Sequence, residues 1–277
     1  MSIITLTTDF GLKDHFVGAL KGKIYSEYSE AKIVDLSHSI DPFNVSEAAY
    51  IIGAAYWSFP KGTVHIIGID IELNHENKHV AIEWNGQFFI AADNGILSIL
   101  TQKVKPEKIV AINIHDRFPI EPTDTEVFVK VACHIAKGGK LNVIGKEIEA
   151  LKQITDLQTS ISEDGKTLKG IVNYIDNYGN AVTNISKKIF EEAQKGRSFE
   201  INFKNKNITT IFAKYSHIGA SKNYPMTYFA SSLLAIFNEN GFLEIAIFKS
   251  NSSTVGSANS LLGLNYRDVV SIVFNNK

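Results

Sequence analysis

The sequence predicts an α/β fold: an amino-terminal, mostly parallel sheet with helices, followed by a smaller, all-β, barrel-like domain. Strand-like and helix-like segments alternate through the first half of the chain. After residue 167, short strand-like runs separated by Gly, Asn and Ser turns replace this alternation. A polar segment without sustained periodicity lies between the two patterns. We therefore expect an α/β domain at residues 1–150, a linker at 151–167 and a barrel-like domain at 168–277.

The first half contains apolar runs of strand length and amphipathic runs of helix length. The expected strands are Ile3–Thr7, Lys32–Asp35, Val64–Asp70, Val80–Trp84, Gln87–Ala91 and Lys108–Ile112. The expected helices are Phe16–Tyr28, Val45–Trp57 and Glu126–Ala136. Their alternation predicts a mostly parallel sheet covered by helices. Asn85-Gly86 lies between two alternating runs, which predicts a β-hairpin.

The pattern of the second half predicts short strands, with the end of one helix at Phe190–Gly196 between them. The expected strands are Gly170–Ile175, Ser198–Phe203, Ile208–Phe212, Leu234–Phe237, Leu243–Phe248 and Asp268–Phe274. Closely spaced strands with polar turns are typical of a small β-barrel or β-sandwich.

Composition excludes several classes of protein. The chain has 277 residues and a formal net charge of −1, so it has no basic field that would hold nucleic acid or an anionic membrane. Cys133 is the only cysteine, which excludes an internal disulfide and argues against a cysteine-based zinc site. No apolar run approaches the roughly 18–20 residues of a membrane span, and no targeting pattern precedes the first strand. We expect a soluble, cytoplasmic protein.

The first predicted strand delivers a carboxylate to the point at which it ends. Ile3–Thr7 is apolar and β-branched, and Thr8-Asp9-Phe10-Gly11 follows it directly. Strands of open α/β sheets present ligand groups at their carboxyl ends, so Asp9 lies where a small molecule would bind, for example through two ribose hydroxyls. The alternative is a turn aspartate that caps the next helix, and the local sequence favours neither.

Asp70 ends the third predicted strand in the same way. A carboxylate that closes a buried apolar strand is unfavourable unless it has a partner or a function, so Asp70 is a candidate site residue. The loop after it carries His75 and His79 without the spacing of a helical metal-binding motif, and we expect no metal site. His38, after the second strand, could act as an acid, a base or a ligand, but a hydrogen bond to a neighbouring loop is the favoured interpretation.

Two further motifs have structural explanations. Asp93-Asn94-Gly95 follows an apolar strand and is explained as a turn. It is a candidate for a function only because it also lies at the end of a strand. Thr123 precedes a helical run and is followed three residues later by Glu126, which is the pattern of a capping box.

The second half holds one stretch dense in polar turn formers, between Asp176 and Asn184. A plain turn needs one or two such residues, whereas this stretch has six, with Tyr178 embedded among them. A planar ligand with amide and amine edges would use such a mixture of an aromatic face, an amide and a carboxylate. Tyr215 could supply a second stacking face, although a lone tyrosine is more often packed in a core.

Taken together, the motifs resemble those of the S-adenosylmethionine (SAM) hydroxide adenosyltransferases and their relatives, the fluorinating and chlorinating enzymes. The likeness runs nearly from end to end, and its specificity lies in the order and spacing of the motifs. They are Thr8-Asp9-Phe10-Gly11, Asp35-Leu36-Ser37-His38, Phe59-Pro60-Lys61-Gly62-Thr63-Val64, Ala92-Asp93-Asn94-Gly95, Asp176 to Asn184, and Asn240-Gly241-Phe242-Leu243-Glu244-Ile245-Ala246.

The resemblance implies a homotrimer in which ligand sites lie between the first domain of one subunit and the second domain of its neighbour. It implies SAM as the substrate and no separate cofactor. It places the ribose hydroxyls at Asp9, the methionine end and ribose at Asp176 and Asn180, and the adenine edge at the backbone around Phe248. The further substrate-binding residues that it implies are Phe10, Tyr178, Tyr215 and Glu239, the last in the turn that replaces a Ser-Ser-Gly turn of the family.

The implied reaction is substitution at the 5′ carbon of SAM, with methionine leaving as a neutral thioether. Because this leaving group needs no acid, catalysis reduces to aligning the nucleophile and removing its water shell. Hydrolytic members of the family use water or hydroxide near an Asp-Arg-His set, and halogenating members hold a halide instead.

This chain departs from the family pattern at that catalytic set. The Asp matches Asp70, but the Arg falls on Asn77, with Lys78 adjacent, and the His falls on Thr123. A water-derived nucleophile needs a base or a cationic partner, and two of the three expected groups are therefore absent. Lys78 could replace the charge of the arginine but not its planar fork. A histidine of the 75–79 loop could take the place of the missing one.

Three functions remain, in order of preference. The first is hydrolysis of SAM to adenosine and methionine, with Asp70 near the water. The second is a catalytically silent protein that binds SAM or adenosine, as the missing Arg and His suggest. The third is SAM-dependent halogenation, which is disfavoured because Asp70 would set a negative charge beside the incoming halide. The sequence has no GxSxG elbow, GxGxxG turn or P-loop, which argues against other common α/β enzymes.

Overall fold

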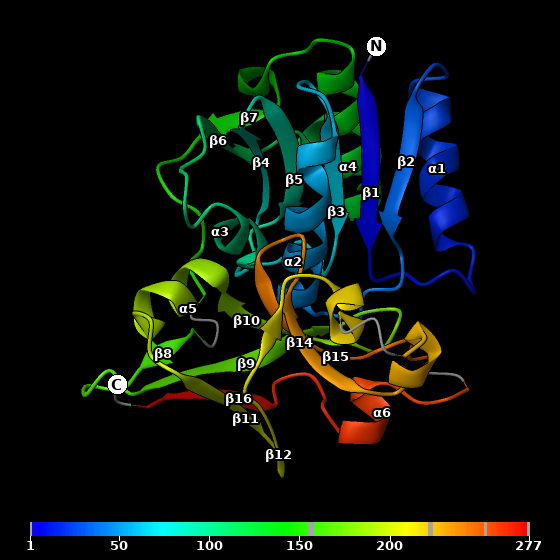
Figure 1. Ribbon diagram of the computed structural model, residues 1–277. Coiled ribbons are helices and arrows are strands. Elements are labelled where there is room, and N and C mark those ends of the chain that lie inside the picture. The colour runs from blue at the N-terminus through cyan, green and yellow to red at the C-terminus, as the bar shows by residue number, and fades with distance from the viewer. Residues whose placement is uncertain (1, 155–157, 221–223, 252–253, 276–277) are drawn as a thin grey trace. The chain divides into compact units, whose positions relative to one another are not determined.

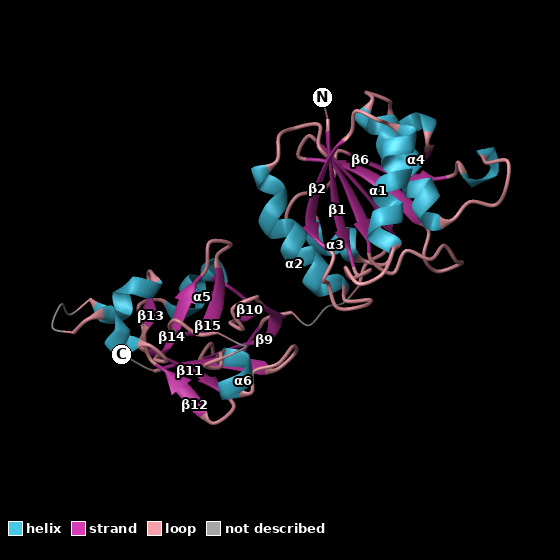
Figure 2. Cartoon of the chain, turned by 90° about the vertical axis from the view of Figure 1, so that its right-hand side faces the viewer, coloured by secondary structure: helices cyan, strands magenta, loops and turns pink. Residues whose placement is uncertain are grey.

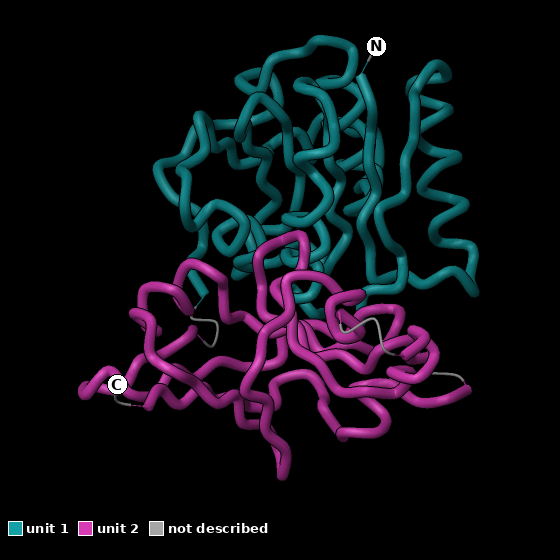
Figure 3. Tube along the Cα trace, viewed as in Figure 1, with its two compact units in different colours: residues 1–154 teal, residues 155–277 magenta. Residues whose placement is uncertain are grey.

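The computed structural model describes residues 2–154, 158–220, 224–251 and 254–275, and it divides the chain into two compact units (Figure 3). Unit 1 is Met1–Ile154 and unit 2 is Thr155–Lys277. Each unit has its own sheet (Figure 1) and its own hydrophobic clusters, and the predicted fold class is confirmed. The segment predicted as a linker, 151–167, contains strand β8 (Ser160–Ile161) and the first residue of β9, and its residues 155–157 lie outside the described residues.

Unit 1 is built on a mixed sheet with the strand order β2-β1-β3-β5-β4-β6-β7. Its strands are β1 (Ile3–Thr8), β2 (Lys32–Ser37), β3 (Val64–Gly68), β4 (His79–Trp84), β5 (Gln87–Ala92), β6 (Lys108–Ile112) and β7 (Gly145–Glu147). The pairs among β2, β1, β3 and β5 are parallel, and the pairs among β5, β4, β6 and β7 are antiparallel. The predicted Asn85-Gly86 turn, with both residues at positive φ, leads β4 directly into β5 and makes that pair antiparallel.

Helices cover both faces of this sheet, as Figure 2 shows. The helices are α1 (Phe16–Glu27), α2 (Val45–Ala55), α3 (Ile96–Leu100) and α4 (Asp124–Ala136). Apolar side chains of α1 and α4 pack with one face of the sheet into one core, and those of α2 and α3 pack with the other face into a second core. Short 3-10 turns are η1 (Tyr56–Ser58), η2 (His115–Arg117) and η3 (Leu141–Val143).

Unit 2 is mainly β, with a path of strands that runs β12-β11-β16-β9-β10-β15-β14-β13 and with β8 paired to β9. Its further strands are β9 (Thr167–Ile175), β10 (Ala181–Ser186), β11 (Phe199–Phe203), β12 (Lys206–Ile208), β13 (Ile211–Phe212), β14 (Leu233–Phe237), β15 (Phe242–Ile247) and β16 (Val269–Phe274). Its helical segments are α5 (Lys187–Gln194), η4 (Tyr215–Gly219), η5 (Met226–Phe229) and α6 (Ala258–Leu262). Of these strand pairs, β13–β14 is parallel and the others are antiparallel.

Several elements differ from the sequence prediction, among them β7, β8 and α6, which were not predicted. Strand β10 begins within the stretch of polar turn formers between Asp176 and Asn184. Its polar side chains bond to the neighbouring strands: Thr183 Oγ1 donates to Leu243 O at 2.9 Å, and Asn184 Oδ1 accepts from Ile171 N. The predicted single strand Ile208–Phe212 is instead two strands, β12 and β13, because β12 pairs with β11 and β13 pairs with β14. Helix α3 follows the Asp93–Gly95 turn and was not predicted.

No helix among the described residues is long and apolar enough to cross a membrane. Within the same residues, no group of three or more His, Cys, Asp or Glu side chains is arranged to hold a metal ion.

Candidate active site

The carboxyl ends of the parallel strands β1, β2, β3 and β5 meet at one edge of the sheet of unit 1. Thr8 lies opposite Gly68 at the ends of β1 and β3, and the N–H of Asp9 donates to Gly68 O at 3.3 Å. A side chain at Gly68 would come within 2.9 Å of the Thr8 methyl group, so glycine allows the two strand ends to approach closely. The residues predicted at the ends of the first and third strands therefore lie on neighbouring strands.

Asp9 is part of this edge and does not cap the next helix, whose N-cap position is His15. Its Oδ2 accepts a hydrogen bond from the N–H of Phe43 at 3.0 Å, which ties the loop before α2 to the end of β1. Phe10 packs half-buried against the core of unit 1, with its ring centroid 6.1 Å from that of Phe16. The helix-cap alternative for Asp9 is thus wrong.

His38 has the structural role that the sequence favoured. Its ring is buried at the ends of β1 and β2, with Nδ1 2.8 Å from Thr8 Oγ1 and Nε2 3.2 Å from Asp35 Oδ1. The hydrogen bond to Thr8 fixes the histidine inside the scaffold, whereas Nε2 lies near Asp35 without a hydrogen bond among the described residues.

Asp70 lies two residues beyond β3, because the strand ends at Gly68 rather than at Asp70 as predicted. Its backbone is left-handed, with φ of 45°, a conformation that costs a residue other than glycine about 1 kcal/mol. Its Oδ2 accepts a hydrogen bond from Asn77 Nδ2 at 3.3 Å. The preceding residue, Ile69, accepts at its carbonyl from Asn94 Nδ2 at 2.9 Å. The structure therefore brings together Asp70, Asn77 and the Asp93–Gly95 turn.

A lysine that the sequence analysis did not select lies on the other side of Asn77. Nζ of Lys152 donates to Asn77 Oδ1 at 3.3 Å, and its backbone N–H donates to Asp93 Oδ1 at 2.9 Å. Burial raises the pKa of Asp93 above its ordinary value, and the charges of Lys152 and Lys78 oppose that shift. Lys78, the predicted replacement for the family arginine, is exposed.

Thr123 forms the predicted capping box at the start of α4. Its N–H donates to Glu126 Oε2 at 2.8 Å, and its hydroxyl donates to the same oxygen at 2.9 Å. The adjacent Asp124 accepts from the N–H of Leu73, in the loop after Asp70, at 3.2 Å. Thr123 is thus engaged in holding the helix, while its neighbour contacts the loop of the candidate site.

A buried histidine also contacts the loop after Asp70. His79 Nε2 lies 2.9 Å from Ile71 O and 3.3 Å from Asp124 Oδ1, and its Nδ1 lies 3.2 Å from Nε2 of His115. Burial lowers the pKa of His79, so the neutral ring is favoured. Of the two histidines considered from the sequence, His79 is inside and His75 is exposed.

The polar stretch of unit 2 is organised around Asp176. Its Oδ1 accepts from the backbone N–H groups of Tyr178 and Asn180 at 2.8 and 2.9 Å, and its Oδ2 accepts from Asn180 Nδ2 at 2.9 Å. The ring of Tyr178 is 65% exposed, so an aromatic face stands free beside a carboxylate whose geometry is fixed.

A second carboxylate joins this group from strand β15. Asn180 Nδ2 also donates to the Tyr215 oxygen at 3.2 Å, and the Tyr215 hydroxyl in turn donates to Glu244 Oε1. Glu244 Oε2 accepts from Asn238 Nδ2 at 3.2 Å. Glu244 is 5% exposed, and burial raises the pKa values of both Glu244 and Tyr215. Asn180 Oδ1 is buried and finds no hydrogen-bond donor among the described residues.

The remaining two predicted residues of unit 2 lie outside this hydrogen-bonded group. Glu239 is exposed in the turn between β14 and β15. Phe248 is buried in the same small apolar cluster as Tyr215, and its backbone N–H donates to Ser232 O at 2.8 Å.

Comparison with known proteins identifies the two units. A model of the SAM hydroxide adenosyltransferase N-terminal domain matches residues 4–145, and a model of the C-terminal domain of the same family matches residues 170–271. The chain belongs to the SAM hydroxide adenosyltransferase family.

Individual relatives agree with this assignment. An (R)-S-adenosyl-L-methionine hydrolase of Methanocaldococcus jannaschii is 30% identical, over 99% of this chain and 97% of the relative. A fluorinase of Actinopolyspora mzabensis is 27% identical, over 70% of this chain and 75% of the relative. The crystal structure of an uncharacterized conserved protein from Thermotoga maritima has the same fold, with a TM-score of 0.81 and 24% identity over 98% of this chain and 100% of the other.

Sequence reasoning did not select Lys152 or Glu244 as site residues, for different reasons. Glu244 carried a local signal, since it is a carboxylate in an otherwise apolar strand of a family motif. Lys152 carried none, because its contacts with Asn77 and Asp93 join residues 75 and 59 positions apart.

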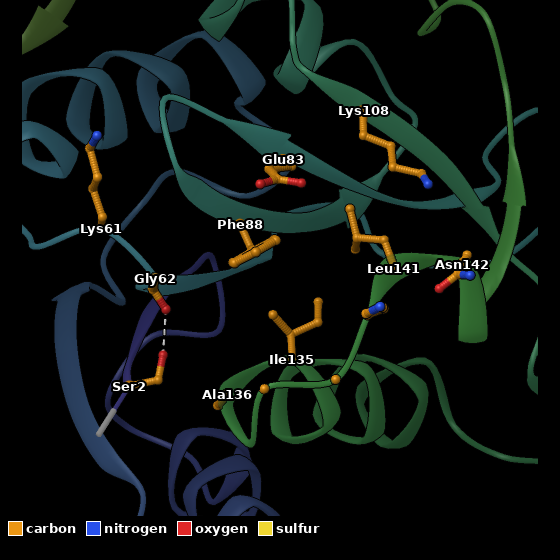
Figure 4. A pocket seen from close by; sticks show the side chains of 13 residues that line it. Ser2, Lys61, Gly62, Glu83, Phe88, Lys108, Ile135, Ala136, Leu141 and Asn142 are labelled. Atoms are coloured by element: carbon orange, nitrogen blue, oxygen red, sulfur yellow. Dashed lines mark hydrogen bonds between the residues drawn. The ribbon is translucent and has the colours of Figure 1, made fainter.

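A cavity of about 650 Å³ lies at the opposite edge of the unit 1 sheet, where β1, β3, β5 and β6 begin (Figure 4). Phe88, Ile135 and Leu141 face its interior, and Lys61 and Lys108 stand at its rim. None of the predicted site residues lines it, so it is separate from the candidate active site.

Proposed function

We propose that this chain hydrolyses SAM to adenosine and methionine. The observation that carries the proposal is Asp70, which the end of β3 and the Asn77 amide hold at the carboxyl edge of a unit with the family's N-terminal domain. The hydrolase of M. jannaschii, similar over nearly the whole length of both chains, supports the same activity.

The reaction is a substitution in which water supplies the incoming oxygen. The oxygen–C5′ bond forms while the C5′–S bond breaks, and the bonding electron pair leaves with sulfur, which becomes the neutral thioether of methionine. The water gives up one proton, so SAM and water yield adenosine, methionine and a proton, and no further cofactor is needed. Asp70 would accept a hydrogen bond from the water and orient it toward C5′.

The substrate-binding residues belong to the same proposal. In unit 1, Asp9 would hold the ribose hydroxyls, with Phe10 beside it. In unit 2, Asp176 and Asn180 would meet the methionine end and the ribose, and Tyr178 and Tyr215 would offer aromatic surface. The unpaired Oδ1 of Asn180 supports this assignment, because a buried acceptor without a donor is unfavourable and a ligand donor would relieve it.

A catalytically silent SAM- or adenosine-binding protein is the second candidate. It is favoured by one observation: Thr123, at the position of the family histidine, is fully engaged in the capping box of α4. Halogenation is a weaker candidate. Fluorinases are among the relatives, but the carboxylate of Asp70 would repel an incoming halide.

We further propose that the chain forms a homotrimer with ligand sites between subunits, as the family resemblance implies. Light scattering coupled to size exclusion should then give a mass three times the 30.7 kDa of one chain. A monomer at micromolar concentration would contradict this part of the proposal.

Incubation of the purified protein with SAM, followed by chromatography, tests the activity. We expect adenosine and methionine to appear in equal amounts at a rate proportional to enzyme concentration. Tight binding of SAM by calorimetry without adenosine release would favour the silent binding protein. Chloride-dependent formation of 5′-chloro-5′-deoxyadenosine would favour the halogenase.

A further inference from the structure

Among the described residues, the side chain that holds the carboxylate of Asp70 is that of Asn77. Asp70 follows β3 in a left-handed backbone conformation and precedes a loop, 72–76, whose residues are exposed. The side chain that reaches its carboxylate is the amide of Asn77, through Nδ2 at 3.3 Å. Whatever fixes the orientation of that amide therefore fixes Asp70.

The side-chain amide of Asn77 has a hydrogen-bond donor, Nδ2, and an acceptor, Oδ1, and each of them has a suitable partner. An ionised carboxylate can only accept hydrogen bonds, and an ammonium group can only donate them. Asn77 Nδ2 faces the Asp70 carboxylate, and Asn77 Oδ1 accepts from the Lys152 ammonium at 3.3 Å. Asn77 is 9% exposed, so the reversed amide would face each partner with the wrong atom and with little water to compensate.

Lys152 is itself anchored in position. Its backbone N–H donates to Asp93 Oδ1 at 2.9 Å, and its Nζ lies 3.4 Å from Glu76 O. The preceding Leu151 is buried in the core that α2 and α3 share with the sheet. The backbone of Lys152 is thus fixed, and its exposed side chain reaches both Glu76 O and Asn77 Oδ1.

Lys152 is better placed than Lys78 to influence Asp70. Lys78 and Lys152 are both exposed and the charges of both act on Asp93, so what distinguishes Lys152 is its contact with Asn77. The ammonium of Lys152 is hydrogen-bonded to the group that holds Asp70.

We propose that Lys152 is a positioning residue that orients Asp70 through the Asn77 amide and brings a positive charge to the site in place of the absent family arginine. This inference rests on the proposed hydrolase activity. A cation one amide away from Asp70 polarises the amide that holds its carboxylate, so the carboxylate stays directed at the water. Its loss should therefore lower kcat and leave KM nearly unchanged.

The test compares Lys152→Met, Lys152→Arg and Lys105→Met in the full-length protein with SAM as substrate. Lys105 precedes β6 at the opposite edge of the sheet, so its variant removes the same charge away from Asp70. We expect Lys152→Met to lower kcat about tenfold with KM within about twofold, since it removes a hydrogen bond to a charged group. Lys152→Arg should retain most of the rate, and Lys105→Met should match the wild type.

Two further measurements separate positioning from a loss of folding. If Lys152 acts through Asn77, Lys152→Met should have little additional effect in an Asn77→Ser background. The side-chain amide resonances of Asn77, assigned with Asn77→Ser, should shift in Lys152→Met and not in Lys105→Met. This second readout does not require turnover.

The outcomes distinguish this inference from the proposed function. An active wild type with Lys152→Met equal to Lys105→Met would overturn the role of Lys152 and leave the hydrolase intact. Unchanged Asn77 amide resonances in Lys152→Met would overturn it as well. A wild type that releases no adenosine would instead overturn the hydrolase, whatever the amide resonances show.

Discussion

The two groups of candidate residues, one in each unit, hold their carboxylates in different ways. At the edge of unit 1, Asp70 lies half-buried on a loop, in a left-handed conformation, with an amide as its side-chain partner. In unit 2, Glu244 lies buried within a strand and accepts from both Tyr215 and Asn238. The carboxylate of Asp70 is partly accessible and accepts a side-chain hydrogen bond at one oxygen, whereas that of Glu244 is buried and accepts hydrogen bonds at both oxygens.

This difference agrees with the different roles that the proposed function gives to the two units. A group that reacts must keep a face toward water, and a loop at the carboxyl end of a strand provides that face. A group that recognises a ligand gains from rigidity, and a hydrogen-bonded cluster inside a β unit provides it. Under the proposed function, unit 1 would perform the chemistry and unit 2 would supply most of the ligand contacts, with Asp9 and Phe10 as the contribution of unit 1 to binding.

The largest effect should come from Asp70→Ala. Removing the carboxylate that orients the water should lower kcat by about a thousandfold, within the range for a lost general base. Binding of adenosine by calorimetry should stay within about twofold, because the binding residues are elsewhere. Asp70→Asn serves as the matched control for shape, and we expect it to be equally inactive. A variant that keeps a tenth of the wild-type rate would remove Asp70 from the mechanism.

Acid should lower the stability of unit 1 relative to that of unit 2, because unit 1 contains a fully buried histidine in its sheet. His65 bonds to Thr5 Oγ1 and Gln87 Oε1, each at 2.7 Å, and burial lowers its pKa from 6.5 to about 4. The unfolded chain therefore takes up a proton at a higher pH than the folded protein. The contribution of His65 is complete above pH 6.5, declines as the pH falls through 6.5, and stops declining near pH 4.

Urea denaturation at pH 7.5 and pH 5 measures this effect. Both tryptophans, Trp57 and Trp84, lie in unit 1, so their fluorescence follows its unfolding. We expect His65 to account for a loss of about 2 kcal/mol at pH 5, which His65→Gln should abolish. His75→Gln, at an exposed histidine, is the control. The prediction is wrong if wild type and His65→Gln lose the same stability in acid.

Tyr215→Phe tests the binding role of unit 2. The change removes a donor to Glu244 and an acceptor for Asn180, so the Asn180 amide loses one of the contacts that orient it. We expect SAM to bind about tenfold more weakly by calorimetry, with kcat at saturation nearly unchanged. Tyr228→Phe, at an exposed tyrosine, should bind normally. Unaltered affinity with a reduced kcat would reverse the assignment of roles.

The smallest effect should come from Thr123→Ala, which tests whether the position of the family histidine still has a catalytic role. Loss of the N-cap should lower the free energy of unfolding by about 1 kcal/mol, with kcat within about twofold of wild type. Thr125→Ala keeps the capping box and should be nearly neutral in both measurements. A kcat reduced tenfold in Thr123→Ala alone would return this residue to the catalytic set.

Most of the fold could be predicted from the sequence because its signals are local. The strands at Ile3–Thr8 and Lys108–Ile112, the Asn85-Gly86 turn and the capping box of Thr123 depend on neighbouring residues, and the structure contains each of them. Strand β10 could not be predicted in this way. Thr183 and Asn184 resemble turn residues until their side chains hydrogen-bond to the strands on either side, Thr183 as a donor and Asn184 as an acceptor.

The same distinction between local and distant contacts applies to the candidate site. Asp9 and Asp70 were predicted because each follows an apolar run, and the contact of Asp176 with Asn180 lies within one turn. Lys152 and Glu244 could not be assigned roles, since their partners are distant in the sequence and come close only when strands pair.

By itself, the sequence determined the α/β and all-β units, their family, and the carboxylates that follow the first and third strands, because periodicity and the residues after a strand can be recognised from consecutive positions. Only the tertiary structure decided the surroundings of those carboxylates: the Asn77 amide and Lys152 at Asp70, and Tyr215 and Glu244 at Asn180. Hydrogen bonds act over about 3 Å of space regardless of separation along the chain, so such partners exist only after folding.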